Sequence, residues 1–596
     1  MSKQFVIGID LGTTNSVLAY APLEGETAEV QILSMPMVVD ASTVENHNSL
    51  PSFLYLATEQ EASSKSLKLP WSEDERFAVG PYARRRAAEL PDRTVAAAKS
   101  WLAHSKVDRR QPILPWNAPE EVGKVSPVVA TQRYLEHLVF AWHAAYPDAP
   151  IAEQDVVLTV PASFDAAARE LTREAAFAAG LPTNLLLLEE PQAAVYSWLN
   201  TAGDNWREHL TVNDTILICD IGGGTTDLTL IRATDEDGEL QLQRIAVGDH
   251  LLVGGDNMDL ALAHLVAERF KDQNVSLDAW QSVALWHSCR NAKEALLAED
   301  GPETHTISVL GRGSKLIGGT VTVDVAREEV ASFLLDGFLP TCKAKDKPRK
   351  QSTSGFQEIG LPFESDPAIT RHVATFVDSH STDEQSAYPS HILFNGGVFK
   401  SAALRTRLLD SIGQWNSKSP SQPLDGGEDL DHAVAQGAAY YGWTKHHGGV
   451  RIRGGVARSY YVGIETSGLA VPGAPRPLRA LCVVPFGMEE GTECEVPSAE
   501  FALVLGEQAT FRLFSSATRK DDQPGTLLNS WTEDELIESD SLETTLLLDE
   551  SIDDPYVPVR FHSRVTELGV FELWCAATRS EGDWKFEFSI REDAEG

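Results

Sequence analysis

The sequence has no stretch approaching the roughly 18 consecutive apolar residues that a membrane-spanning helix needs, so no such helix is expected. Its start, MSKQFVIGID, has a single Lys and neither a long apolar region nor a cleavage site, so no secretory signal is expected. Cysteine is also scarce. The six cysteines are scattered and form no CxxC pair, which favours buried thiols in a reducing cytoplasm over a redox or metal motif.

Basic residues are in deficit. The chain has 50 Lys and Arg against 87 Asp and Glu, a formal net charge of −37 over 596 residues. Such a charge repels phosphate-rich surfaces, so neither nucleic acid nor an anionic membrane is expected as a partner. The apolar content of 42% is typical of a folded protein, and the length predicts two or more domains.

The first 445 or so residues alternate short β-rich runs with helix-like stretches, which is the pattern of α/β layers. The β-rich runs are FVIGID, VVLTV, TILICDI and HILFNGG. FDAAARELTREAAFAAG predicts a helix that starts at the N-cap Asp165 and ends at Gly180, and HAVAQGAAYYGWTKHH predicts a second helix. Residues 341–366 contain a basic, proline-bearing run and predict an inserted loop whose role stays open.

The pattern changes after about residue 445. Residues 446–458 are rich in Gly and Arg and predict a linker. Residues 459–596 contain short strand-like runs separated by turn signals, which predicts an all-β sandwich or barrel-like unit. The acidic run ELIESDSLETTLLLDESIDDP within it fits either an edge strand or a loop.

Two phrases in the α/β part are nearly the same, IGIDLGTTNS and ICDIGGGTTD. In each, an aliphatic run ends in an aspartate, Asp10 or Asp220, and turns through Gly and Thr-Thr. Such a tip presents backbone N–H groups and hydroxyls to phosphate oxygens, and an ionised Asp suits Mg²⁺ held through its waters. One tip is a weak signal, but two predict facing lobes that clamp a polyphosphate and Mg²⁺.

Three further motifs follow the same order as in a known family: VLTVPASFDAAARELTREAAFAAGL with LLEEPQAAVYS, then VGDHLLVGGDNMDLAL, then HILFNGGVFKS with DLDHAVAQGAAYYG. The chain therefore resembles the seventy-kilodalton heat-shock chaperones (DnaK-type) of the actin-like ATPase superfamily. The resemblance implies a two-lobed α/β ATPase with duplicated ribonuclease-H-like lobes in residues 1–445. Lobe I would cover about 1–185, lobe II about 186–430, and a crossover helix about 430–445; the 165–180 helix is also expected to cross between lobes.

The C-terminal region, 459–596, resembles the family's substrate-binding sandwich by its strand pattern and by VPFGMEEGTE and FRLFSS. The family's helical lid is not expected, because no helix-like segment follows the last strand-like run. The linker also lacks the family's acidic, leucine-bearing run.

By similarity, particular residues receive roles in binding ATP or ADP. Those expected to contact the nucleotide are Gly12, Thr13, Thr14 and Asn15 from lobe I, Gly222, Gly223, Gly224 and Thr225 from lobe II, and Gly254, Gly255, Arg290, Lys293, Glu294, Gly396, Gly397, Lys400 and Asp431 around the nucleoside. Asp10 and Asp220 would hold the hydration shell of Mg²⁺, and Thr225, Glu190 and Asp220 would orient the attacking water. Pro161 and Arg169 match the family's interdomain relay. Solvent-facing positions for Asp256 and Asp259, and a surface position for Glu189, stay open.

Several positions depart from the family pattern. Arg84, in VGPYARRR, stands where the family has a catalytic lysine; we expect it to keep phosphate binding, but its forked guanidinium leaves the hydrolysis rate open. In CRNAKEALL, Arg290 stands where the family usually has Glu, Glu294 where it has a basic residue, and Leu297 where it has Ser. This exchange over one helical turn fits either a rearranged surface pair or an altered nucleotide preference.

The sequence thus predicts a cytoplasmic, ATP-dependent, chaperone-like protein whose slow Mg-dependent hydrolysis of ATP regulates binding of unfolded or extended polypeptide by the β domain. A J-domain co-chaperone and a nucleotide exchange factor are the implied partners. The alternative is a nucleotide-gated scaffold with little or no turnover, which Arg84, the altered helix and the unusual linker favour. A small-molecule kinase would leave the sandwich unexplained, and the appended domain and the charge disfavour a filament.

Overall fold

The computed structural model describes residues 3–589 except 65, 72–75, 105, 117, 120, 237, 311–319, 350–360, 362, 382–386, 416–419, 425–428, 455, 457, 467–476, 507, 517, 533–534, 539–541, 546–555, 567–569 and 580–581. The chain divides into two compact units, residues 1–451 and 452–596. Their division falls within the 446–458 segment expected to be a linker. Among the described residues, no helix combines the length and the apolar character needed to cross a membrane.

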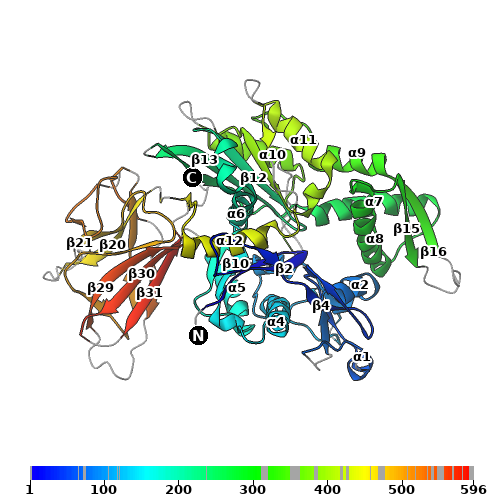
Figure 1. Ribbon diagram of the computed structural model, residues 1–596, viewed down its shortest axis with the longest axis horizontal. Helices are drawn as coiled ribbons and strands as arrows, with labels where there is room; N and C mark the ends of the chain where they lie inside the picture. Colours follow the sequence, from blue (N-terminus) through cyan, green and yellow to red (C-terminus); the bar gives the residue numbers. More distant parts are fainter. Residues whose placement is uncertain are drawn as a thin grey trace. The chain divides into compact units, whose positions relative to one another are not determined.

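The first unit contains two sheets of the same topology (Figure 1). The first has the order β11-β10-β1-β2-β3, formed by β1 (Phe5–Leu11), β2 (Asn15–Pro22), β3 (Gln31–Ile32), β10 (Asp155–Val160) and β11 (Leu186–Glu189). The second includes the order β18-β17-β12-β13-β14, formed by β12 (Thr215–Ile221), β13 (Thr226–Glu236), β14 (Glu239–Val247), β17 (His391–Asn395) and β18 (Gln422–Pro423).

Corresponding strands also run in corresponding directions. β1 is antiparallel to β2 and parallel to β10, and β12 is antiparallel to β13 and parallel to β17. Because β1 and β12 lie inside layered sheets, they read as continuous aliphatic runs rather than alternating ones. The expected duplicated, two-lobed architecture is confirmed. The first sheet reaches Glu189, a few residues past the expected boundary near 185.

Two helices connect the lobes. The helix α6 (Glu190–Ala202) follows β11 and contacts β12 and β17 of the second sheet, whereas α12 (Ala433–His447) contacts β1, β2 and β10 of the first. They pack on each other so closely that a Cβ on Gly437 would overlap the Ala193 carbonyl. The helix α5 (Ala166–Ala178) has the expected N-cap, since Asp165 accepts the Ala168 amide at 2.6 Å. It packs on α4 (Pro127–Ala145) in lobe I, so the expectation that it crosses between lobes is wrong.

Each lobe carries further elements beside its sheet. In lobe I these include β4 (Met35–Asp40), β5 (Thr43–His47), β6 (Leu50–Pro51), β7 (Leu54–Leu56), α1 (Glu59–Ser63), β8 (Phe77–Val79), α2 (Pro81–Glu89), β9 (Thr94–Val95) and α3 (Ala98–Leu102). In lobe II they include α7 (Gly255–Asp272), α8 (Ala279–Leu297), β15 (Thr304–Leu310), β16 (Thr320–Ala326), α9 (Arg327–Phe338), α10 (Ile369–Ser379) and α11 (Ala402–Gly413). The helices α2 and α8 contact each other across the lobes.

The second unit is a two-sheet β structure. One sheet has the order β26-β21-β20-β25-β27, from β20 (Ser459–Glu465), β21 (Leu478–Val484), β25 (Leu513–Ser516), β26 (Leu527–Leu528) and β27 (Ile537–Glu538). The other contains β22 (Thr492–Glu495), β23 (Phe501–Val504), β29 (Tyr556–Val565), β30 (Val570–Ala577) and β31 (Asp583–Ser589). Side chains from both sheets share one core, including Val462, Leu481, Val559 and Phe571. The expected sandwich is therefore confirmed.

Two sequence features lie partly outside the described residues. In the expected insertion, residues 341–349 form no helix or strand, and 350–360 are not described. The acidic run contributes β27 and β28 (Leu542–Thr545), and its remainder from 546 to 555 is not described.

Candidate functional site

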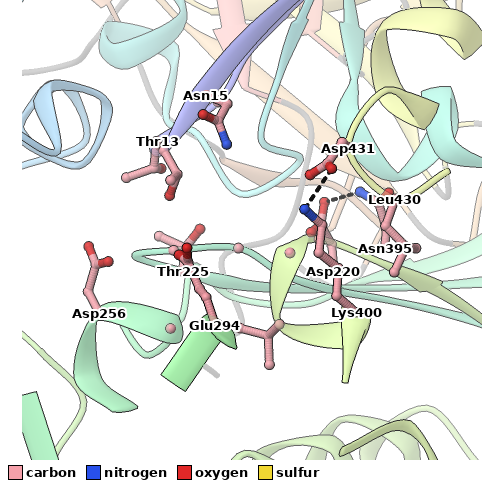
Figure 2. Close-up of a pocket in the computed structure, with 18 of the residues that line it drawn as sticks. Thr13, Asn15, Asp220, Thr225, Asp256, Glu294, Asn395, Lys400, Leu430 and Asp431 are labelled. Atoms are coloured by element: carbon pink, nitrogen blue, oxygen red, sulfur yellow. Dashed lines mark hydrogen bonds and ion pairs between the residues drawn. The ribbon is translucent and has the colours of Figure 1, made fainter. Parts of the chain in front are cut away.

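The two Gly-Thr tips meet at a cavity of about 380 Å³. One tip joins β1 to β2 and the other joins β12 to β13, because each strand turns back after its terminal aspartate and one further apolar residue. A Cβ on Gly223 would overlap the Thr14 hydroxyl, and one on Gly224 would lie 2.9 Å from the Ser100 hydroxyl of α3. Figure 2 shows Thr13 and Asn15 on one side of the pocket and Thr225 on the other. The duplicated phrase thus supplies two facing walls.

Three carboxyl groups line the cavity between the tips: Asp10, Glu190 and Asp220. Burial raises the pKa of each above its usual range, and the pKa of Asp220 reaches about 7. Asp10 accepts the Thr159 hydroxyl at 3.1 Å, and Asp220 accepts the Asn395 amide at 2.7 Å. Asp10 and Asp220 thus each accept one hydrogen bond from a neighbouring strand. These bonds hold the two carboxyl groups in place, while burial leaves their negative charge poorly solvated.

A buried lysine that the sequence analysis did not single out faces these carboxyl groups. Lys99 on α3 is 9% exposed, lines the cavity and places Nζ 2.5 Å from Glu190 Oε1. Burial alone would lower the pKa of Lys99, but the charges of Glu190 and Asp10 and the hydrogen bond to Glu190 raise it overall. Lys99 is therefore a cation. The sequence signal is a lone lysine in the small-residue run VAAAKS.

Asp227 is a second residue that the sequence analysis did not assign. It lies two residues after Thr225, is 4% exposed and lines the cavity. It accepts the Ser163 hydroxyl from lobe I, and the same hydroxyl lies 2.6 Å from His250 Nδ1 of lobe II. Burial opposes ionisation of Asp227, but the hydrogen bond and charge of His250 and the Ser163 hydroxyl lower its pKa overall. This contact joins the lobes behind the second tip.

On the side of α7 and α8, Arg290 binds two aspartates. Its Nη2 contacts Asp256 Oδ1, and its Nε lies 2.8 Å from Asp259 Oδ2, while Lys293 Nζ lies 2.6 Å from Asp259 Oδ1. Arg290 is 6% exposed and Asp259 1% exposed. Arg290 is therefore not part of a surface pair with Glu294, and that interpretation is wrong. The interpretation that Asp259 faces solvent is also wrong.

Arg84 and Glu294 form an ion pair between the lobes. Arg84 lies on α2 and Glu294 on α8, and both line the cavity. Arg84 Nη2 lies 3.0 Å from Glu294 Oε2, and the two side chains are 29% and 51% exposed. The two departures from the family pattern therefore contact each other at the solvent-exposed edge of the site.

The opposite edge of the cavity is formed by the segment after β17. Gly396, Gly397 and Lys400 line it, and Lys400 Nζ lies 2.6 Å from Asp431 Oδ2 (Figure 2). Gly396 has a φ of +88° and packs directly against the end of β12, a conformation and spacing that only glycine fits well.

Most of the residues predicted for the nucleotide site line this one cavity. Gly224 and Gly254 are not among them, but both pack against it: a Cβ on Gly254 would lie 2.7 Å from the Gly223 carbonyl oxygen. Pro161 and Arg169 lie outside the lining, and Arg169 donates to the Ala162 carbonyl at 3.1 Å. Glu189 is fully buried beside Arg244 at 2.8 Å, so the interpretation of it as a surface residue is wrong.

The donor set fits a hydrated divalent cation. Within the described part of the chain, no group of three or more His, Cys, Asp or Glu side chains is placed to hold a metal directly. Asp10 and Asp220 nevertheless lie at the two tips, and burial raises the pKa of both. A divalent cation bound near them would supply positive charge and so lower these pKa values. Mg²⁺ commonly binds through one or two carboxylates plus waters and substrate phosphates.

Comparisons with known proteins find similar sequences among chaperones. The family model described as "Hsp70 protein" matches residues 68–344. The chain is 28% identical over 370 residues to a chaperone protein HscA homolog of Acinetobacter baumannii (strain ATCC 17978), covering 60% of this chain and 51% of that protein. It is 29% identical over 392 residues to chaperone protein HscA of Pectobacterium carotovorum subsp. carotovorum (strain PC1), covering 63% and 54%. The chain spans about half the length of the curated relatives it matches.

Proposed function

The chain belongs to the Hsp70 family, and from that premise we propose that it binds Mg·ATP between its two tips, hydrolyses it slowly, and thereby regulates binding of extended polypeptide by its β unit. The observation that carries the proposal is the meeting of two Asp-Gly-Thr tips at one cavity. Thr14 and Gly223, from different lobes, are in such close approach that a single added carbon would overlap the hydroxyl.

The chemistry asked of the site is phosphoryl transfer to water. The water oxygen forms a bond to the γ-phosphorus, the bond from that phosphorus to the β,γ-bridging oxygen breaks, and the electron pair leaves with ADP. The water's protons pass to the released phosphate and solvent. Mg²⁺, when bound, neutralises charge on the phosphate oxygens. The tip amides and hydroxyls would hold the phosphates, and Glu190 and Thr225 would orient the water.

Binding of a polypeptide by the β unit has a physical basis in one of its sheets. The two end strands in that sheet's order, β26 and β27, are two residues long and carry exposed apolar side chains. Leu527 on β26 is 37% exposed and Ile537 on β27 is 55% exposed. A strand edge with exposed apolar groups suits an extended apolar segment, which gains main-chain hydrogen bonds there. Client polypeptides, a J-domain co-chaperone and a nucleotide exchange factor are the partners proposed.

The test is single-turnover hydrolysis of Mg·ATP by the full chain, combined with release of a fluorescent apolar peptide. We expect slow conversion to ADP, reduced at least 10-fold by Thr225→Ala, and a peptide release rate that differs between ATP and ADP. Tight ATP binding without turnover would favour the alternative, a nucleotide-gated scaffold. Absence of ATP binding would contradict both.

A further inference from the structure

We propose that an exposed basic strip on lobe II binds a short acidic segment of a partner protein. The strip consists of Lys343, Lys345, Lys347 and Arg349. It lies between α9 and α10, in the inserted segment whose role the sequence left open. None of its residues lines the nucleotide cavity, so the inference does not depend on the proposed nucleotide function.

The four cations of the basic strip alternate with residues that contact lobe II. All four are exposed, whereas the three residues between them are half-buried: Ala344, Asp346 and Pro348. Because a chain advances at most about 3.6 Å per residue, the backbone positions of the four cations lie within about 22 Å of one another. The segment therefore presents a short, dense row of positive charge to solvent.

These charges are not neutralised within the molecule. In the part of the chain that the structure describes, none of the four side chains has an ion-pair or hydrogen-bond partner. Two cations on the neighbouring helices do have one: Arg371 on α10 lies 2.8 Å from Asp366, and Arg407 on α11 lies 3.3 Å from Asp336. Although the chain has 87 acidic side chains, the basic strip is open to an anion from another molecule.

The backbone of the segment is bound to lobe II. The Trp415 indole donates to the Cys342 carbonyl at 2.8 Å, and the Cys342 thiol donates to the Thr370 carbonyl at 3.4 Å. At the other end of the strip, the Arg349 amide donates to Asp366 Oδ2 at 2.7 Å. These bonds fix the segment and leave its cationic side chains exposed. A partner therefore does not have to order the segment, which lowers the entropic cost of binding.

An exposed aromatic ring lies close to the strip in the chain's path. Phe363 is 51% exposed, and two residues later the Ser365 hydroxyl donates to the Arg349 carbonyl at 3.5 Å. This contact brings the returning part of the insertion beside the end of the strip. An exposed ring gains free energy when an apolar side chain covers it. The ring and the strip together fit a segment in which acidic side chains flank an apolar one.

The net charge of −37 favours a short acidic polypeptide segment over other anions. Nucleic acid or an anionic membrane would extend beyond the strip and meet a surface that repels it. A short segment places its carboxylates on the strip alone, within the screening length of about 8–10 Å at ordinary salt. Complementary charge of this kind steers the partner to one place on the molecule and makes its binding dependent on salt.

The inference is tested by fluorescence anisotropy of the full chain with a labelled peptide of Asp and Glu residues around one central Leu. Lys343→Gln/Lys345→Gln/Lys347→Gln/Arg349→Gln should weaken binding of this peptide about 10-fold or more, because all four charge contacts are lost. Raising the salt from about 0.05 M to about 0.5 M should weaken binding to the unsubstituted chain and have little effect on the variant.

Two further variants separate a specific site from a general effect of charge. The matched control, Arg85→Gln/Lys106→Gln/Arg110→Gln/Lys271→Gln, removes the same number of exposed cations from elsewhere in the first unit and should bind the peptide normally. Phe363→Ala should weaken binding of the Leu peptide about 3-fold or more and leave a matched peptide with Ser at that position unaffected. Thermal midpoints should be nearly equal in all these variants, because only exposed side chains are changed.

Several outcomes would overturn the inference. The first is equal peptide affinity in the strip variant and the unsubstituted chain, and the second is an equal loss in the matched control. The third is tighter binding of a labelled oligothymidylate or of phosphatidylserine vesicles than of the peptide, abolished in the strip variant, which would assign the strip to another class of anion. The fourth is self-association of the unsubstituted chain that the strip variant lacks, which would make a second copy the occupant.

Discussion

At the scale of single residues, the departures from the family pattern form compensating contacts. Arg84 meets Glu294, and Arg290 meets Asp256 and Asp259. A reversed charge at 290 would be costly if it were buried alone, but two aspartates from α7 surround it. Each of the three departures, Arg84, Glu294 and Arg290, therefore has a partner of opposite charge among the residues that line the cavity.

A buried ion pair between the lobes should matter far more than an exposed one. Glu189 ends β11 and Arg244 lies on β14, and their side chains are 0% and 9% exposed. Arg244→Met would leave a buried carboxylate without its cation, so we expect a loss of about 3–5 kcal/mol in the free energy of unfolding, measured by urea denaturation. Arg85→Met, which breaks an exposed pair with Asp40, is the control and should cost less than about 1 kcal/mol. Equal losses would contradict this account of the lobe contact.

The titration of Asp220 gives a prediction with a definite sign. Burial raises the pKa of Asp220 to about 7 from its ordinary value of 3.8. Between these values the folded chain holds a proton that the unfolded chain has lost, so stability falls as the pH rises from about 4 to about 7. In Asp220→Asn this contribution is absent, and the Asn395 amide still has an acceptor. We therefore expect the thermal midpoint of Asp220→Asn, relative to that of the unsubstituted chain, to rise between pH 5 and pH 8 when both are measured without Mg²⁺ and nucleotide. If the two midpoints change with pH in parallel, the raised pKa of Asp220 is contradicted.

At the scale of elements, the site depends on close backbone approach between a tip and the start of α7. A Cβ on Gly254 would lie 2.7 to 2.9 Å from backbone atoms of Gly222, Gly223 and Thr225. Backbone atoms cannot rotate away as a side chain can, so the tip itself would have to move. The glycine is therefore required by packing, since its φ of −167° is extended backbone open to any residue.

We accordingly expect Gly254→Ala to lower stability by about 1–3 kcal/mol and ATP affinity at least 10-fold, because the phosphate-binding tip is displaced. Thermal unfolding and calorimetry provide the two measurements. The control is Gly337→Ala on α9, where an added Cβ meets nothing within 4 Å outside the helix and helix propensity favours Ala. Normal nucleotide affinity in Gly254→Ala would show that the tip tolerates the shift.

The sequence predicts features that depend on neighbouring residues better than features that depend on contacts between residues far apart in the chain. The tips at Asp10 and Asp220 were predictable, because strand, aspartate, glycine and threonines are contiguous and the phrase occurs twice. Lys99 was not, because its burial depends on the left-handed turn at Ala97 and on carboxyl groups remote in sequence. The pairing of Arg84 with Glu294, 210 residues away, likewise depends on how α2 meets α8. The crossing helix was misassigned because α5 and α6 are consecutive, and only packing distinguishes them.

At the scale of the whole molecule, duplication explains the design of the first unit. Two sheets of equal topology bring equivalent aspartates to one cavity, and α6 and α12 pack together where the chain passes between lobes. Because the carboxyl groups of Asp10, Glu190 and Asp220 are buried in this cavity, the pKa of all three is raised. Ligand binding should therefore be linked to proton release.

This linkage predicts a pH-dependent affinity. Because Mg²⁺ needs ionised carboxylates and the pKa of Asp220 is about 7 without it, the affinity for Mg·ADP should rise about 10-fold from pH 6 to pH 8. Calorimetry in buffers of different ionisation enthalpy should detect protons released on binding. A pH-independent affinity without proton release would mean that the cation does not contact these carboxyl groups.

The central claim is that the two tips together hold a magnesium-bound nucleotide, and calorimetric titration of the full chain with ATP, in the presence and absence of Mg²⁺, tests it most directly. The account predicts one site per chain, with an affinity that depends on Mg²⁺ and that falls at least about 10-fold in Gly254→Ala. No binding, or binding that neither Mg²⁺ nor Gly254→Ala affects, would contradict a nucleotide site between the tips.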